Sequence, residues 1–272
     1  MKTKSITLKL CLLLNLFIVT VSIVIGTWSI KDTNKIVQVE MGKMNSEILE
    51  EVSDNISILV SNIEEIGNNI VEDNKLVSAL SIRADEVIEN TEDVIDSSKY
   101  VEGLLNEQVW KYGKYNMKPE LYLISENGLN FSTYSKNKYT MDSIKSELWY
   151  NKIIEANGKT VLISTFEDEE GIGPYKCIFR MGRVIKDLIT GETLGVLIMD
   201  VSEKMLYDRY NKIIKDGRNI YIIDIKGNII SSKDKRLIGE NYYKELDYGN
   251  YIETEEWYSI FKRVYEDSIY IR

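Results

Sequence analysis

The sequence predicts an α+β protein with an N-terminal membrane helix, a long helical stalk and two antiparallel-sheet modules, the second of them incomplete. Three observations lead to this prediction. An uncharged apolar run opens the chain, apolar residues at a helical period follow it, and beyond Pro119 the apolar period changes to two. With 272 residues, the chain is long enough for two small domains.

The apolar run at residues 10–30 predicts a transmembrane signal anchor. As a helix it spans roughly 30 Å, the thickness of the hydrocarbon core of a bilayer. Lys2, Lys4 and Lys9 precede the run and no acidic residue does. The positive-inside rule therefore predicts a single-pass protein of the cell membrane, with residues 1–9 in the cytoplasm and the bulk of the chain extracytoplasmic. The alternative is a cleaved signal peptide, which would have a shorter apolar region and a small-residue cleavage site.

Residues 31–118 predict a helical stalk. Steps of three and four residues separate its apolar side chains, which is typical of an a/d seam. The seam either packs on its own domain or joins a second copy in a homodimer, and both can hold at opposite ends. It consists of Met41, Met44, Ile48, Val52, Ile56, Leu59, Ile63, Ile66 and Ile70.

Residues 119–201 predict a membrane-distal sheet module. The stretch from Leu121 to Tyr134 indicates a hairpin, because Asn127-Gly128 suits a tight turn. A helix over residues 141–157 should end at Gly158. Three further strands are expected over residues 160–166, 175–186 and 192–201. An antiparallel sheet with helices on one side is a PAS-like α+β layout.

Residues 202–218 predict a connecting helix, and residues 219–272 a membrane-proximal PAS-like module that is truncated. A second hairpin, turning at Lys226-Gly227, begins this module, but few residues follow for its remaining strands. We therefore expect an exposed apolar edge near Ile220, Ile222 and Ile229. We also expect the chain to be the input half of a longer receptor, without its output domain.

Composition argues against several classes of function. The chain contains no histidine, which excludes Ser-His-Asp and Cys-His catalytic sites and histidine-ligated zinc. Its two cysteines, Cys11 and Cys177, are isolated and form no metal-ligand spacing. The formal charge of −9 argues against nucleic acid. We expect no enzymatic activity, cofactor, metal or nucleic-acid partner.

The layout as a whole resembles the extracytoplasmic double Cache (dCache) sensor domain of bacterial two-component sensor histidine kinases and chemoreceptors. The resemblance covers about residues 31–272 and depends on residues 185–201, the hairpin at 222–232 and Ile238-Gly239. It implies a membrane-anchored sensor domain of a signal-transduction receptor, which binds a small ligand in its distal module. The alternative is a non-enzymatic envelope scaffold that binds a partner protein.

An amino-acid-sensing branch of this family carries a pattern of Tyr, Arg, Trp-Tyr, Tyr and Asp. The resemblance implies ligand contacts from Tyr139, Glu147, Trp149, Tyr150, Tyr175 and Asp200. Glu147 stands where the family has an arginine that grips a carboxylate, so the ligand class stays open among an amine, an amino acid, a peptide and a sugar. Asp200 and the tyrosines suit an ammonium group. The alternative is that the aromatic residues are core, whereas Asp200, at a strand end beside a cavity, is expected outside the core.

Overall fold

A 70-residue helix, α1 (Lys2–Val71), opens the chain in the computed structural model. The chain divides into two compact units, Met1–Ile48 and Leu49–Arg272. The structure describes residues 2–89, 92–113, 118–134, 139–167, 176–187, 189–213, 219–224, 226–242, 262–265 and 269–271.

The first unit holds the apolar run of the sequence. Its large side chains are exposed, Leu10 by 67% and Trp28 by 71%. Within the described residues, α1 is the one helix that is long and apolar enough to cross a membrane. The seam residues Met41 and Met44 are also exposed here, by 50% and 41%.

In the second unit, the seam of α1 is buried. Val52, Ile56 and Ile63 are completely inaccessible to solvent, as are the other seam residues up to Ile70. This part of the seam therefore packs on its own domain, as one of the two interpretations expected. Three helices follow: α2 (Asn74–Leu80), α3 (Ala84–Glu89) and α4 (Glu92–Gly113).

The first sheet confirms the predicted antiparallel module. Its strand order is β2-β1-β5-β4-β3, and every neighbouring pair is antiparallel. The predicted turn at Asn127-Gly128 joins its first two strands, and Gly128 has the positive φ of +93° that such a turn requires. The strands are β1 (Glu120–Ser125), β2 (Phe131–Ser132), β3 (Val161–Glu167), β4 (Cys177–Lys186) and β5 (Thr193–Ser202).

The helix expected over residues 141–157 is two helices, α5 (Met141–Lys145) and α6 (Leu148–Glu155). Thr140 and Ser143 form a capping box that begins α5. The chain then leaves the helical conformation, because Glu147 is extended, with ψ of 138°, and begins α6 as its N-cap. The prediction of one helix was wrong because apolar periodicity does not reveal a break of only two residues, Ser146 and Glu147.

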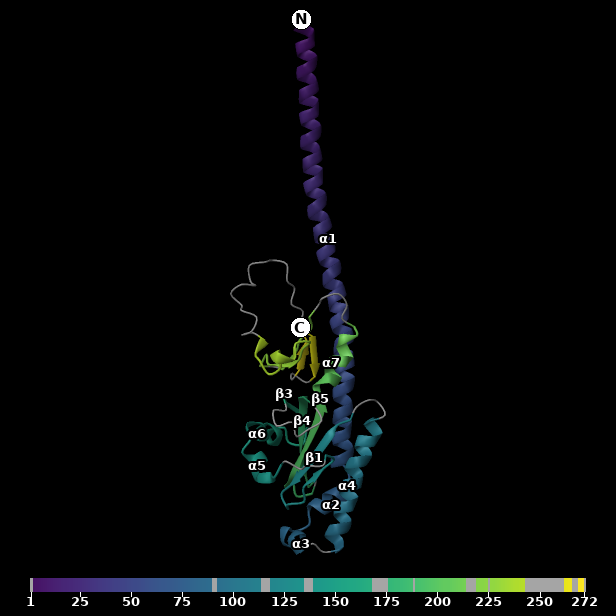
Figure 1. The fold of residues 1–272 in the computed structure, drawn as a ribbon, viewed down its shortest axis with the longest axis vertical. Coiled ribbons are helices and arrows are strands. Elements are labelled where there is room, and N and C mark those ends of the chain that lie inside the picture. The colour runs from purple at the N-terminus through teal and green to yellow at the C-terminus, as the bar shows by residue number, and fades with distance from the viewer. Residues whose placement is uncertain are drawn as a thin grey trace. The chain divides into compact units, whose positions relative to one another are not determined.

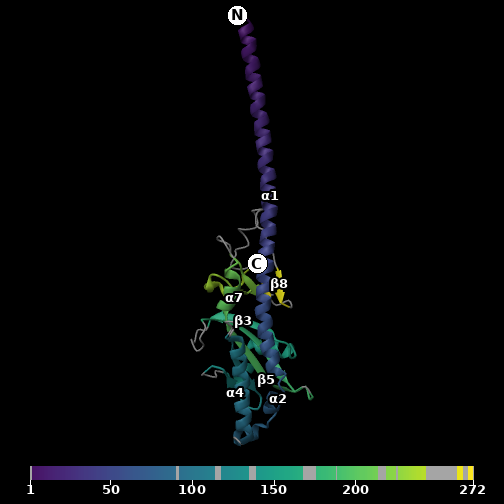
Figure 2. The same ribbon diagram turned by 90° about the vertical axis from the view of Figure 1, so that its right-hand side faces the viewer.

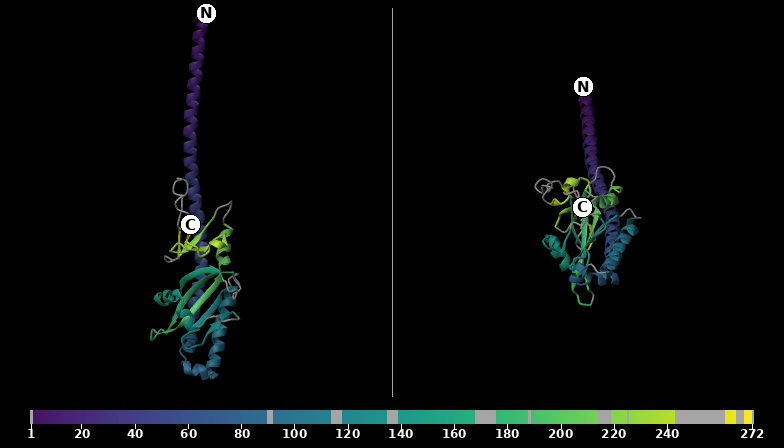
Figure 3. Two further views of the ribbon diagram at one scale, coloured as in Figure 1. Left: turned by 60° about the vertical axis from the view of Figure 1, so that its left-hand side comes forward. Right: turned by 60° about the horizontal axis from the view of Figure 1, so that its bottom comes forward.

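Helices cover both faces of the first sheet (Figures 1 and 3). One face lies under α5 and α6, and α6 contacts β3 and β4. The other face packs against α2, α4 and the buried part of α1. A Cβ atom added to Gly67 of α1 would lie 3.4 Å from Met199 Cε of β5, so the helix approaches the sheet closely. A strand between two such layers is buried on both faces, which explains the nearly continuous burial of β4 and β5.

The helix α7 (Glu203–Asn211) follows β5 directly and precedes a second sheet (Figures 1 and 2). This sheet has the strand order β7-β6-β9-β8, and a short 3-10 helix, η1 (Lys235–Leu237), follows β7. Its strands are β6 (Ile222–Asp224), β7 (Ile229–Ser231), β8 (Lys262–Tyr265) and β9 (Ile269–Ile271).

The expectation that the second module has an exposed apolar edge is wrong. Ile220, Ile222 and Ile229 are 6%, 0% and 2% exposed. The reason is that β9, from the stretch in which we expected strands to be missing, pairs with β6. Its partner β8 comes from the same stretch.

Candidate functional site

A row of polar side chains crosses the face of the first sheet that lies under α5 and α6. Strand pairing places Glu120 opposite Asp200, Asp200 opposite Arg180, and Arg180 opposite Ser164. Directly paired residues point to the same face of a sheet, so these four side chains are neighbours. Glu120, Asp200 and Arg180 are 6%, 0% and 4% exposed, so three charged side chains of this row are buried together.

Arg180 and Asp200 form a bidentate ion pair. Arg180 Nε donates to Asp200 Oδ1 over 2.6 Å and Arg180 Nη2 donates to Asp200 Oδ2 over 2.5 Å. Nη2 also donates to the hydroxyl oxygen of Tyr139 over 2.5 Å. The guanidinium carbon lies 5.1 Å from the ring centroid of Tyr139 and 4.8 Å from that of Phe166. Burial lowers the pKa of Arg180, but the charge and hydrogen bonds of Asp200 outweigh burial. The pKa of Arg180 is therefore raised above its ordinary value, and the side chain stays charged.

Tyr122 and Glu120 continue the row on β1. The Tyr122 hydroxyl donates to Glu120 Oε2 over 3.0 Å, and its ring meets that of Tyr139 edge-on at 5.2 Å between centroids. Burial raises the pKa of the Tyr122 hydroxyl, and the nearby carboxylates of Glu120 and Asp200 raise it further. Tyr139 therefore connects the ion pair to Tyr122.

The structure brings four of the six predicted site residues to this face. Tyr139, Trp149 and Tyr150 are half-buried and pack against one apolar cluster, whose buried members are Tyr122, Ile124, Ile144, Ile153, Val184, Val196 and Ile198. Asp200 lies in the polar row of the same sheet face. Glu147 is exposed at the N-cap of α6, away from the row. Tyr175 lies outside the described residues.

The surroundings of Asp200 differ from those expected, because its side chain is buried. It was expected beside a cavity and outside the core, but it is completely buried and both of its carboxylate oxygens accept hydrogen bonds from Arg180. The expectation failed because β5 lies between two helical layers, so its last residues remain covered.

Sequence reasoning missed Arg180, Glu120 and Tyr122. The available signal was Arg180, one of two arginines in the segment CIFRMGRVIK, because a charged residue in a strand buried on both faces needs a partner. The partner could not be identified from the sequence, since Asp200 is 20 positions further along the chain.

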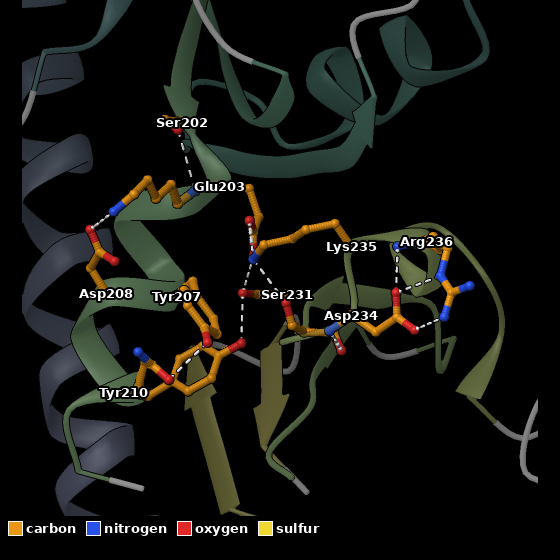
Figure 4. Close-up of polar contacts among 12 residues, drawn as sticks. Ser202, Glu203, Tyr207, Asp208, Tyr210, Ser231, Asp234, Lys235 and Arg236 are labelled. Carbon is orange, nitrogen blue, oxygen red and sulfur yellow. Dashed lines mark hydrogen bonds and ion pairs between the residues drawn. The ribbon is translucent and has the colours of Figure 1, made fainter.

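A second polar cluster ties α7 to the second sheet (Figure 4). Glu203, which is 1% exposed, accepts hydrogen bonds from Lys235 Nζ and from the hydroxyl of Ser231. The ion pair between Lys235 Nζ and Glu203 Oε2 measures 2.6 Å. The Tyr210 hydroxyl lies 3.0 Å from Ser231 Oγ, and Lys235 Nζ lies 4.1 Å from the ring centroid of Tyr207. Since Glu203 begins α7 and Ser231 belongs to β7, this cluster joins the end of the first module to the second.

The described residues include no group of three or more cysteine, aspartate or glutamate side chains arranged to hold a metal ion. No protein-family model matches the sequence, and no curated protein matches it.

Solved structures of similar fold are ligand-binding domains of chemoreceptors. The ligand-binding domain of the Pseudomonas aeruginosa amino-acid chemoreceptor PctB, in complex with L-Arg, has a TM-score of 0.59 and 14% identity over 85% of this chain and 93% of that one. The PctC domain of the same organism, in complex with GABA, has a TM-score of 0.55 and 13% identity over 86% and 97%. The domain of the Pseudomonas fluorescens chemoreceptor CtaA, in complex with L-serine, has a TM-score of 0.54 and 14% identity over 85% and 95%. The likeness confirms the predicted dCache fold.

Proposed function

We propose that this chain is a non-enzymatic sensor input domain, which binds a small polar ligand on the α5–α6 side of its first sheet. The observation that carries the proposal is the buried Arg180–Asp200 pair with Tyr139, on the sheet face that Trp149 and Tyr150 also cover. Buried charges beside half-buried aromatic side chains are common at binding sites. The fold supports the same function, because the similar solved structures are ligand-binding domains.

A ligand screen on the full chain in lipid nanodiscs tests this proposal. Thermal unfolding would be measured against amino acids, amines, short peptides and sugars. Binding to the folded state raises the midpoint by mass action, so a true ligand should raise it in proportion to the logarithm of its concentration. No stabilisation by any compound at saturating concentration would contradict the proposal and favour an inert scaffold.

Two variants locate the binding site. Trp149→Leu removes a half-buried ring on the α5–α6 side and should weaken binding. Trp110→Leu is the matched control, because Trp110 is 67% exposed on α4, which packs against the other face of the sheet. Equal ligand affinity in both variants would place the site elsewhere.

The first unit supports a membrane anchor for this sensor. We propose that the exposed apolar part of α1 spans the bilayer with its lysine-flanked end in the cytoplasm. The exposed seam residue Met41 then belongs to a contact with a second copy. Met41→Cys, in a background with Cys11 and Cys177 replaced by serine, should form disulfide-linked dimers in membranes. Glu40→Cys, on a different face of the same helix, should form fewer.

We further propose that the Glu203–Lys235 cluster carries a ligand-induced shift to the second sheet. Asp200 and Glu203 are separated only by Val201 and Ser202 at the end of β5, so a displacement of the strand at the binding face moves both. The ion pair with Lys235 then passes that displacement to β7 and η1. Hydrogen exchange of β7 should change on ligand addition in the wild type, and less in Lys235→Met.

A further inference from the structure

The buried carboxylate of Asp200 sits in a set of groups that is complete for holding a cation. Both of its oxygens accept hydrogen bonds, the Tyr139 hydroxyl accepts a third, and the rings of Tyr139 and Phe166 lie within 5.1 Å and 4.8 Å of the bound cation. A carboxylate combined with aromatic rings is the chemistry that proteins use for organic cations. The cation in this structure is a side chain of the protein itself, the guanidinium of Arg180.

We propose that the Arg180 guanidinium permanently occupies a cation subsite made by Asp200, Tyr139 and Phe166. The ligand of this module therefore does not bind Asp200 through an amino group. The inference deepens the proposed function and rests on it for the identity of the site. It assigns Arg180 as the residue that decides ligand class.

Burial of Arg180 makes it costly for a ligand to displace its guanidinium from Asp200. A ligand ammonium that took over Asp200 would have to displace the guanidinium, and Arg180, only 4% exposed, would then be a buried cation without its carboxylate. Breaking a buried ion pair in this way weakens binding by roughly 150- to 4,000-fold. The register of β4 and β5 fixes Arg180 directly opposite Asp200, so the internal cation also competes without loss of translational freedom.

The remaining chemistry of this face describes the ligand. Arg180 and Asp200 neutralise each other, Glu120 in the same row accepts a hydrogen bond from Tyr122, and Trp149 and Tyr150 pack against the apolar cluster of this face. Such a surface suits a small molecule that carries hydroxyl or amide groups, which can donate hydrogen bonds and pack against aromatic rings, and a sugar fits this description.

Chemical rescue tests the inference without a known ligand. Arg180→Ala in the full chain should leave an empty cation subsite at Asp200, and methylguanidinium should then raise the thermal midpoint of this variant by about 3–6 °C at ten times its Kd. The wild type should show no such rise, because its subsite is filled. Arg180→Ala/Asp200→Ala should show none either, because the carboxylate is gone.

If Arg180→Ala does not fold alone, recovery of its circular dichroism on refolding becomes the readout. Recovery with methylguanidinium, and not with an equal concentration of urea, supports the inference. A folded Arg180→Ala variant that methylguanidinium does not stabilise overturns it, and so does failure of the unfolded variant to recover. Stabilisation of the wild type by ethylammonium that Asp200→Asn abolishes also overturns it. Failure of the ligand screen would leave the rescue result standing, so the two proposals fail separately.

Discussion

Lys235→Met should destabilise the fold far more than loss of an ordinary surface ion pair. Lys235 is the cationic partner of Glu203, whose side chain is 1% exposed, and the variant removes the positive charge while the Ser231 hydroxyl still donates to that carboxylate. Removal of one partner from a buried pair typically costs about 3–5 kcal/mol. The Lys235 side chain is 35% exposed, so water reaches its end of the pair and lowers the expected loss to about 2–3 kcal/mol.

The helix α7, which holds Glu203, provides a matched control. Lys204 pairs with Asp208 across one turn of α7, with side chains 70% and 48% exposed. Lys204→Met should therefore change the free energy of unfolding by less than about 0.5 kcal/mol. Both variants remove one lysine that pairs with a carboxylate of α7, so the difference between them reports the burial of that carboxylate.

Urea unfolding of the full chain in nanodiscs, followed by circular dichroism, measures both effects. For a unit of this size, the expected loss corresponds to a fall in thermal midpoint of about 4–12 °C. A double variant, Glu203→Leu/Lys235→Met, should recover much of the stability, because it removes the unpaired charge as well as the pair. If Lys235→Met behaves like Lys204→Met, the reasoning that Glu203 depends on Lys235 is refuted.

Three further predictions concern the first sheet. Gly195→Ala should cost about 1–3 kcal/mol, because its Cβ would lie 2.6 Å from a main-chain carbonyl oxygen of β1, whereas Gly103→Ala, in open space on α4, should stabilise by about 0.5–1 kcal/mol in the same urea assay. Asp200→Ala should cost about 3–5 kcal/mol, since it leaves the buried Arg180 unpaired, and a loss under 1 kcal/mol in urea unfolding would contradict this. The raised pKa of Tyr122 means that the unfolded chain loses this proton near pH 10 while the folded chain keeps it, so stability should fall as pH rises above about 10. Tyr122→Phe should reduce that slope by up to about 1.4 kcal/mol per pH unit, and an unchanged slope in urea titrations would show that Tyr122 ionises in the folded state.

Local chemistry was sufficient to predict the two hairpins and the start of the connecting helix. The turns at Gly128 and Gly227 have φ of +93° and +83°, which glycine adopts without strain, and both hairpins were predicted from them. Ser202, expected to begin the connecting helix, is the N-cap of α7 and accepts a hydrogen bond from the Lys204 amide.

The candidate site was harder to predict because its contacts are long-range. The pairing of Arg180 with Asp200 depends on the register of two strands, and no local pattern specifies that register. Burial of Asp200 depends in addition on helices on both faces of the sheet, whereas an apolar period of two indicates one covered face. Tyr139 joins the pair from a segment 41 positions before Arg180.

The charged row also bears on how the sheet avoids misfolding. β4 and β5 are long, and most of their residues are buried and apolar, so such strands can pair in several alignments of similar energy. A slip of β4 by one residue would turn Arg180 toward the opposite face, where Met181 now packs, and would leave Asp200 facing an apolar partner. Either outcome leaves an unpaired charge buried away from water, so the misaligned sheet is much less stable than the native one. We therefore expect the pair to act during folding as a check on strand alignment, and charge-free replacements such as Arg180→Met/Asp200→Leu to aggregate more on refolding even where the folded protein is stable.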